Sequence, residues 1–182
     1  RDLAIDVSDM RYRAGGINHM AFYLELEGRD TAGNWRDLYP LLQRGYAQKR
    51  IPFATGANPR CPNLVRYEVM KHFGLFVTES SEHFAEYVPW FIKSHRPDLI
   101  DRFKVPLDEY PKRCEEQLVD WKDQVVQFRS AEEIEIHQSH EYAAQIMNAV
   151  VTGSPAVIYG NIPNQGYIPQ LPEGCAVEVP CL

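Results

Sequence analysis

GGINHMAFYLELE, at residues 15–27, is the stretch around which we expect the fold to be built. From His19 onward its side chains alternate between two faces, a period of two that predicts a half-buried β-strand. The glycine pair before it lets the backbone bend or approach a neighbour where a Cβ would clash. Asn18 can both donate and accept hydrogen bonds, and histidine is the commonest metal-ligand side chain. Because a strand would hold Asn18 and His19 rigidly, this stretch is the candidate chemical centre.

The flanking sequence predicts a chain of mixed helices and strands. Residues 10–15 are expected to form a strand that leads into the glycine pair. The other expected elements are strands at 156–160 and 176–180 and helices at 38–46, 63–73, 107–129 and 141–151, with one more helix capped by Ser80 or Ser81. The helix at 107–129 has an apolar stripe that we expect to be buried, formed by Leu118, Trp121, Val125 and Phe128.

Composition and charge exclude several classes of protein. The chain has 182 residues, 45% hydrophobic and 24% charged, which is ordinary for a globular protein. A net charge of −6 argues against a surface for nucleic acid or anionic membrane, and no apolar run is long enough to span a membrane. The four cysteines form no CxxC pair, so we expect reduced thiols and a cytoplasmic protein. The start at Arg1 and the abrupt end at Leu182 predict a piece of a longer protein.

Three candidates for carrying chemistry stand out: His19, the segment 79–87 and Tyr67. His19 is either a metal ligand whose partners come from elsewhere or a strand histidine that makes one hydrogen bond. Residues 79–87 (ESSEHFAEY) combine carboxylates, a histidine and a phenol, which suits general acid–base work but equally suits a capped, solvated helix face. Tyr67 is either a phenolate base beside a cation or a surface tyrosine. No dinucleotide, P-loop, nucleophile-elbow or HExxH motif occurs in the chain.

Residues 161–166 (NIPNQG) lie between the two last expected strands. Asn and Gly tolerate left-handed backbone conformations, so a tight turn explains this segment completely. Amide side chains at strand ends can also bind sugar hydroxyls. Both interpretations of Asn161 and Asn164 remain open at this point.

The long motifs together resemble one family. The resemblance rests on residues 11–13 (RYR) and 16–27, on VRYE at 65–68, on residues 76–87, on VPLDEYPKRC at 105–114 and on the segment from 157 to 181. In these stretches the chain is similar to glycoside hydrolase family four, and within it to the bacterial α-galactosidase branch. These enzymes require a nicotinamide dinucleotide and a divalent metal. One departure is Ala14-Gly15, where the close relatives carry Cys-Ala.

The resemblance implies a fold and its missing parts. Residues 1–182 would form an incomplete C-terminal catalytic and metal-binding domain of the α/β (α+β) class. Its helices would pack on a mixed or antiparallel sheet, as in the C-terminal domain of lactate and malate dehydrogenases. The Rossmann domain for NAD, the metal-binding cysteine and the last helices would lie outside this chain. The expected assembly is a cytoplasmic homo-oligomer, a dimer or a tetramer.

The resemblance also implies a reaction on an α-galactoside such as melibiose, with NAD and Mn²⁺ or another divalent metal. The sugar C3 hydroxyl is oxidised, a base removes the C2 proton and the aglycone leaves by elimination, unlike the two-carboxylate displacement of most glycosidases. The implied site residues are His19 for the metal, Asn18, His83, Glu86, Asn161 and Asn164 for the substrate, and Tyr67, Glu79 or Tyr87 as the base. The alternatives are an α-galacturonidase, an α-glucosidase, or a non-catalytic binding module. Without its dinucleotide domain the isolated chain is expected to be inactive.

Overall fold

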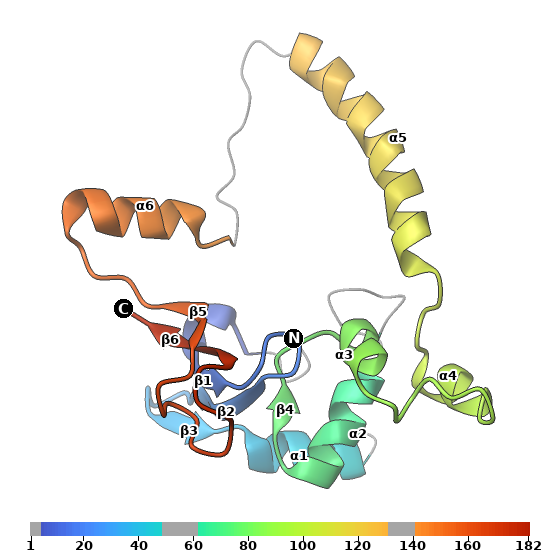
Figure 1. Cartoon of the computed structure of the whole chain (residues 1–182), viewed down its shortest axis with the longest axis horizontal. Helices are drawn as coiled ribbons and strands as arrows, with labels where there is room; N and C mark the ends of the chain where they lie inside the picture. Colours follow the sequence, from blue (N-terminus) through green and yellow to red (C-terminus); the bar gives the residue numbers. More distant parts are fainter. Residues whose placement is uncertain (1–4, 49–61, 131–140) are drawn as a thin grey trace. The chain divides into compact units, whose positions relative to one another are not determined.

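The computed structural model describes residues 5–48, 62–130 and 141–182, which fall into two compact units. The larger unit comprises Arg1–Val105 and Val157–Leu182, and the smaller comprises Pro106–Ala156 (Figure 1). Each unit is described by itself. The α/β class with antiparallel sheets agrees with the expectation from the sequence.

Strand β2 (Phe22–Arg29) is the centre of the main sheet, as the alternation at residues 15–27 predicts. It pairs antiparallel along its length with β1 (Met10–Gly15). The two ends of β2 pair on its other edge with different short strands, β3 (Trp35–Asp37) and β4 (Phe76–Val77). The strand starts at Phe22 rather than at His19, because the preceding residues form a turn.

The C-terminal hairpin is joined to the glycine pair. Strands β5 (Ile158–Pro163) and β6 (Ala176–Cys181) pair antiparallel, as expected, in a two-stranded sheet of their own. Gly16 donates to the Glu178 carbonyl at 3.1 Å and accepts from the Glu178 amide at 2.8 Å. Gly16 has a φ of +149°, and a Cβ built on it would lie 2.7 Å from the Ala21 Cα. The glycine at this position is therefore required by a close backbone approach.

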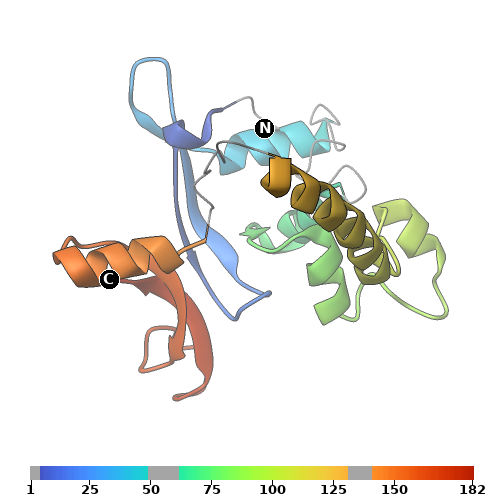
Figure 2. The ribbon, with the colours of Figure 1, turned by 90° about the horizontal axis from the view of Figure 1, so that it is seen from above.

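Four helices lie among the described residues of the larger unit, and the sequence predicted the starts or ends of several. They are α1 (Tyr39–Ala47), α2 (Leu64–Phe73), α3 (Ser81–Tyr87) and α4 (Asp98–Phe103), preceded by a 3-10 turn at Val7–Asp9. The α2 helix ends at Gly74, which has a left-handed φ of +79°. The β5–β6 hairpin lies on the β1 side of β2, and α1, α2 and α3 lie on the other (Figures 1 and 2).

Two apolar clusters stabilise the larger unit, and α2 contributes to both. One joins α2, α3 and the segment up to Val105 around Phe84, Phe91 and Phe103. The other joins β2, α1 and α2 around Leu38, Tyr67 and Phe76. Buried side chains of this size are worth about 1.5–3 kcal/mol each, so the clusters fix the sheet against the helices that hold the site.

The described residues of the smaller unit form α5 (Glu109–Ser130) and α6 (Ala143–Thr152). Both helices form where the periodicity predicts them. The expectation that the α5 stripe is buried is wrong for this chain, since Leu118 is 64% exposed and Trp121 is 58% exposed. Periodicity can form the helix, but burial needs an opposing apolar surface, and the described residues of the smaller unit provide none for this stripe.

Two smaller expectations can be compared with the described part of the chain. Cys114, Cys175 and Cys181 are free thiols, while Cys61 lies outside the described residues. Among the described helices, none has the length and apolarity needed to cross a membrane.

Candidate functional site

The turn between β1 and β2 carries Asn18 and His19 at the edge of the sheet. The Met20 amide closes it by donating to the Ile17 carbonyl at 2.7 Å. His19 has a φ of +63°, in the left-handed region that a residue other than glycine seldom adopts. Such conformations cluster at functional sites, where neighbouring contacts hold them. Asn18 is exposed in the same turn.

Glu79 is the polar partner of His19. Its Oε2 lies 2.5 Å from His19 Nδ1, and its Oε1 accepts from the Ser80 amide at 2.7 Å. Partial burial acts to raise the pKa of Glu79, but the hydrogen bonds from Ser80 and His19 outweigh it, so the pKa lies below its usual value. Glu79 is therefore a carboxylate at neutral pH.

Helix α3 brings further side chains to His19. The Ser80 side chain caps the helix by accepting from the His83 amide at 3.2 Å, which confirms the predicted cap. The Tyr87 ring stacks on the His19 ring with centroids 5.0 Å apart and planes 9° apart. The His83 ring lies edge-on to His19 at 6.0 Å, and His83 Nδ1 is 3.2 Å from Glu86 Oε2. The turn and the helix thus place these residues in one cluster.

The ligand-type atoms of this cluster suit a divalent cation. Glu82, His83 and Glu86 each offer one ligand atom, and these atoms lie within 4.8 Å of one another. These atoms are one imidazole nitrogen and two carboxylate oxygens, which can bind a divalent cation or accept hydrogen bonds from sugar hydroxyls. His19 is not part of this group and adds a second imidazole beside it, with its ring 6.0 Å from that of His83. The donor chemistry of the site therefore fits the metal that the resemblance implies.

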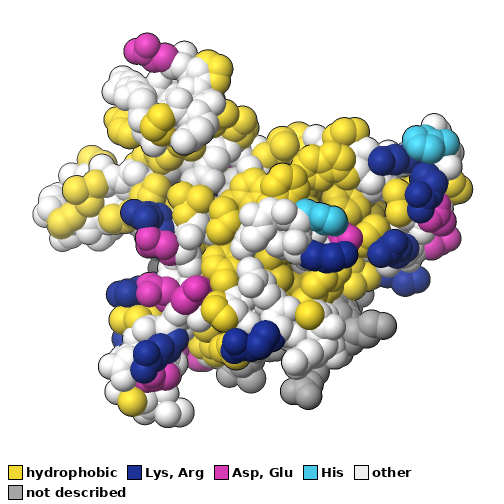
Figure 3. Space-filling view, turned by 90° about the horizontal axis from the view of Figure 1, so that it is seen from below, with side chains coloured by type: hydrophobic (Ala, Val, Ile, Leu, Met, Phe, Trp, Pro, Cys, Tyr) yellow, Lys and Arg dark blue, Asp and Glu magenta, His cyan; other side chains and the backbone are white. Residues whose placement is uncertain are grey.

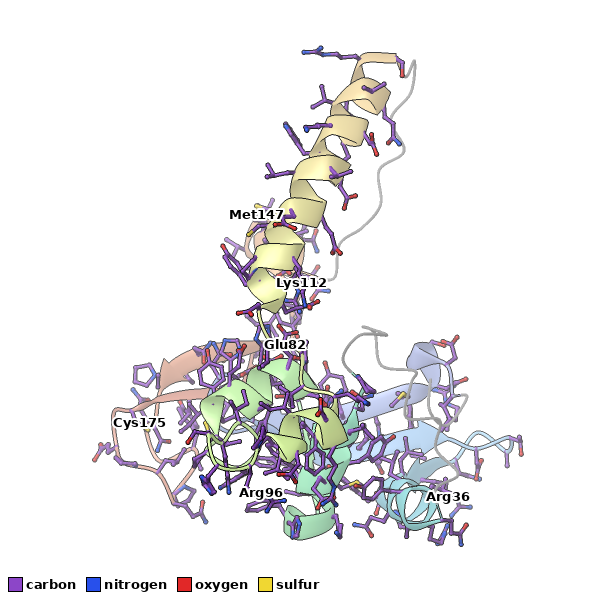
Figure 4. All side chains as sticks on the ribbon, turned by 90° about the vertical axis from the view of Figure 1, so that its right-hand side faces the viewer. Arg36, Glu82, Arg96, Lys112, Met147 and Cys175 are labelled. Atoms are coloured by element: carbon purple, nitrogen blue, oxygen red, sulfur yellow. The ribbon has the colours of Figure 1, made fainter. Side chains whose placement is uncertain are left out.

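Glu82 lies in the acidic segment 79–87 that the sequence singled out, but it is not among the site residues that the resemblance implies. It lies on α3 (Figure 4), and the residue is only 4% exposed. The signal was present, because Glu82 and Glu86 are four residues apart and so lie on one face of a helix. In the space-filling view of Figure 3, Lys and Arg side chains lie in several small groups rather than in one basic patch.

Tyr67 lies apart from this cluster in the apolar core. It is 1% exposed, stacked on Tyr46 at 5.3 Å and edge-on to Phe76 at 5.1 Å. Tyr87, in contrast, is 53% exposed and touches His19. Of the three residues considered for the base, the structure brings Glu79 and Tyr87 to His19.

The two asparagines of the C-terminal hairpin have different surroundings. Asn164 is 1% exposed, and its Nδ2 donates to the carbonyls of Ile168, Leu171 and Pro172 at 3.0–3.2 Å. Its Oδ1 accepts from the Ile168 amide at 3.1 Å. Asn161 is exposed on β5 opposite Glu178. The Asn164 side chain is thus engaged within the loop that links β5 and β6.

Several known proteins are similar to the chain. An α-galactosidase from Bacillus subtilis (strain 168) is 38% identical over 180 residues, which are 99% of this chain and 39% of that enzyme. An α-galactosidase from Rhizobium meliloti (strain 1021) is 25% identical, covering 94% of this chain and 34% of that enzyme. An α-galacturonidase from Thermoanaerobacter italicus is 23% identical over 93% of this chain and 38% of that enzyme. The chain therefore spans about two-fifths of the length of these relatives.

Solved structures share the fold. The protein lplD from Bacillus subtilis superimposes with a TM-score of 0.74 at 20% identity, covering 98% of this chain and 41% of that one. A 6-phospho-α-glucosidase from gut microorganisms, solved in complex with NAD and Mn²⁺, has a TM-score of 0.59 at 17% identity and covers 98% of this chain and 39% of that one. The family described as the C-terminal domain of family 4 glycosyl hydrolases matches residues 14–182. The chain therefore belongs to the family 4 glycosyl hydrolases and represents their C-terminal domain.

Proposed function

We propose that this chain is the C-terminal part of an α-galactosidase that cleaves α-galactosides such as melibiose with the help of NAD and a divalent metal. The observation that carries the proposal is the cluster of His19, Glu79, His83 and Tyr87, which the turn before β2 and helix α3 form together. The 38% identity to an α-galactosidase supports the substrate class.

The residues of the cluster divide into distinct roles in this proposal. His19 would hold the metal, and Asn18, His83 and Glu86 would contact sugar hydroxyls. In this proposal bound NAD would supply a hydride acceptor, and a bound metal would supply positive charge to stabilise negative charge on sugar oxygens. NAD would be bound by a domain outside this chain, because no dinucleotide motif occurs in the sequence.

The base that removes the C2 proton is best assigned to Tyr87. A base must come within hydrogen-bond reach of the proton that it removes. Tyr87 is exposed and stacks on the proposed metal ligand, whereas Tyr67 is 1% exposed inside the core. Tyr87→Phe keeps the ring and removes only the hydroxyl, so it should lower kcat by about 10²–10⁴-fold.

The test is a substrate comparison with the protein that contains this chain and its dinucleotide domain. Nitrophenyl α-galactoside, α-galacturonide and α-glucoside are compared in the presence of NAD, Mn²⁺ and a reductant. We expect the galactoside to be preferred, His19→Ala to abolish the metal-dependent rate, and Glu25→Gln on the exposed face of β2 to retain it. Preference for the galacturonide or the glucoside would replace the substrate assignment, and absence of any turnover would favour a binding module.

A further inference from the structure

Both oxygens of the Glu79 side chain are engaged in hydrogen bonds in this structure. Oε2 faces His19 Nδ1 at 2.5 Å, and Oε1 accepts the Ser80 amide hydrogen at 2.7 Å. A carboxylate can only accept hydrogen bonds, so the hydrogen between Oε2 and the ring must belong to His19. The imidazole is then protonated at Nδ1, and its free lone pair is on Nε2.

Glu79 is itself held in place from both sides. On its N-terminal side, Thr78 donates through its amide and its hydroxyl to the Ala21 carbonyl at 3.0 and 3.2 Å. On its C-terminal side, Ser80 is the cap of α3. Ala21 lies two residues after His19, so the segment that carries Glu79 is fixed to the end of the turn between β1 and β2 that holds His19.

The His19 ring is constrained in three ways at once. The turn sets the backbone, the Glu79 hydrogen bond sets the rotation of the ring, and the parallel Tyr87 ring covers one of its faces. A left-handed conformation is strained for a residue with a side chain, and such strain persists only where surrounding contacts determine the conformation. Histidines that bind metals commonly donate their other N–H to a carboxylate, which fixes the tautomer and raises the basicity of the ligand.

We propose that Glu79 is a positioning residue, which holds His19 so that Nε2 is the nitrogen that binds the metal. This inference rests on the proposed function for the metal itself. It removes Glu79 from the residues considered for the C2 base, because its carboxylate serves His19 and the start of α3.

Glu79→Gln tests this role because an amide offers only one acceptor oxygen. The Gln oxygen can serve His19 or Ser80, but not both, and the –NH₂ group must face the other donor. We expect Mn²⁺ affinity, measured by electron paramagnetic resonance without substrate or NAD, to fall about 10–100-fold. Glu25→Gln makes the same change on β2, where Glu25 pairs with Arg13, and should leave Mn²⁺ affinity unchanged.

Nitrogen NMR of the metal-free protein gives a second, independent measurement. In the neutral ring, wild-type His19 should carry its hydrogen on Nδ1, and Glu79→Gln should shift the ring toward the Nε2–H form. A wild-type His19 protonated at Nε2 would overturn the inference, and so would a Glu79→Gln variant with unchanged Mn²⁺ affinity. A lower kcat with unchanged Mn²⁺ affinity would return Glu79 to the role of base. If the wild type binds no Mn²⁺, the proposed function fails, and the tautomer alone then decides the role of Glu79.

Discussion

Replacing Asn164 by alanine should destabilise the loop between β5 and β6 without a direct effect on substrate binding. The Asn164 Nδ2 carries two hydrogens for three neighbouring carbonyls, and Oδ1 accepts one amide hydrogen, so about three hydrogen bonds are satisfied at a time. At about 1 kcal/mol each, their loss should lower the local stability of the loop by about 3 kcal/mol. The carbonyls can be hydrated in the variant, because the loop is largely exposed, so we add no further penalty.

Hydrogen exchange at the Ile168 amide measures this loss directly. That amide donates to Asn164 Oδ1 in the wild type. A loss of about 3 kcal/mol corresponds to an exchange rate about 100-fold faster in Asn164→Ala. Asn161→Ala is the matched control, because Asn161 is exposed on β5 and its loss should change stability by less than about 0.5 kcal/mol.

The result that would refute this reasoning is a stable Asn164→Ala variant. If Ile168 exchange is unchanged and KM for the glycoside rises, Asn164 contacts the substrate, as the resemblance implies. If exchange accelerates while KM in the remaining folded enzyme is unchanged, its role is structural. Asn161 would then be the hairpin asparagine still available to the sugar.

Three further changes test the fold around the site. Ser80→Ala removes the cap of α3 and should lower the free energy of unfolding by about 1 kcal/mol in urea titrations, with Ser80→Thr retaining most of it. Gly16→Ala places a Cβ 2.7 Å from a backbone atom and should cost about 2–3 kcal/mol, whereas Gly33→Ala, which meets nothing within 4 Å, should cost about 1 kcal/mol. Burial and the hydrogen bond to Glu68 raise the pKa of Tyr46 from 10.0 to about 12, so the folded chain keeps this proton at a pH where the unfolded chain loses it. Stability should therefore fall between these two pH values by on the order of 1 kcal/mol after solvent screening, and Tyr46→Phe should flatten that fall in alkaline urea titrations.

Local patterns predicted most of the secondary structure because each element carries its own signal. The alternation at residues 15–27 identified β2, Gly74 marked the end of α2, and a serine at 80 or 81 was expected to cap α3. What local patterns could not predict is which surfaces meet. By its alternation, Leu24 lies on the same face of β2 as Leu26, which is 8% exposed, yet Leu24 is 48% exposed. The stripe on α5 failed for the same reason, since burial depends on a partner surface that periodicity does not specify.

The site shows the same division between local and long-range information. The sequence indicated His19 and the acidic segment of α3 separately, each with an ordinary structural alternative. The Glu79 hydrogen bond, 60 residues away along the chain, joins them, and only the tertiary fold can reveal it. Tyr67 and Tyr87 were equivalent as candidates in the sequence, because the difference between them is burial, at 1% and 53% exposed.

The glycine pair links the sheet and the site through one short turn. Gly16 forms two backbone hydrogen bonds with Glu178, which join the C-terminal hairpin to the turn. His19 lies in the same turn. Ala21, two residues after His19, accepts two hydrogen bonds from Thr78, and Thr78 directly precedes Glu79 in the sequence. A side chain at Gly16 would push against Ala21 and so disturb the turn, the hairpin and the Glu79 segment together. Gly16→Ala should therefore lower Mn²⁺ affinity as well as stability, although Gly16 bears no ligand atom. A variant that loses stability but keeps wild-type Mn²⁺ affinity would show that the turn holds His19 independently of the hairpin.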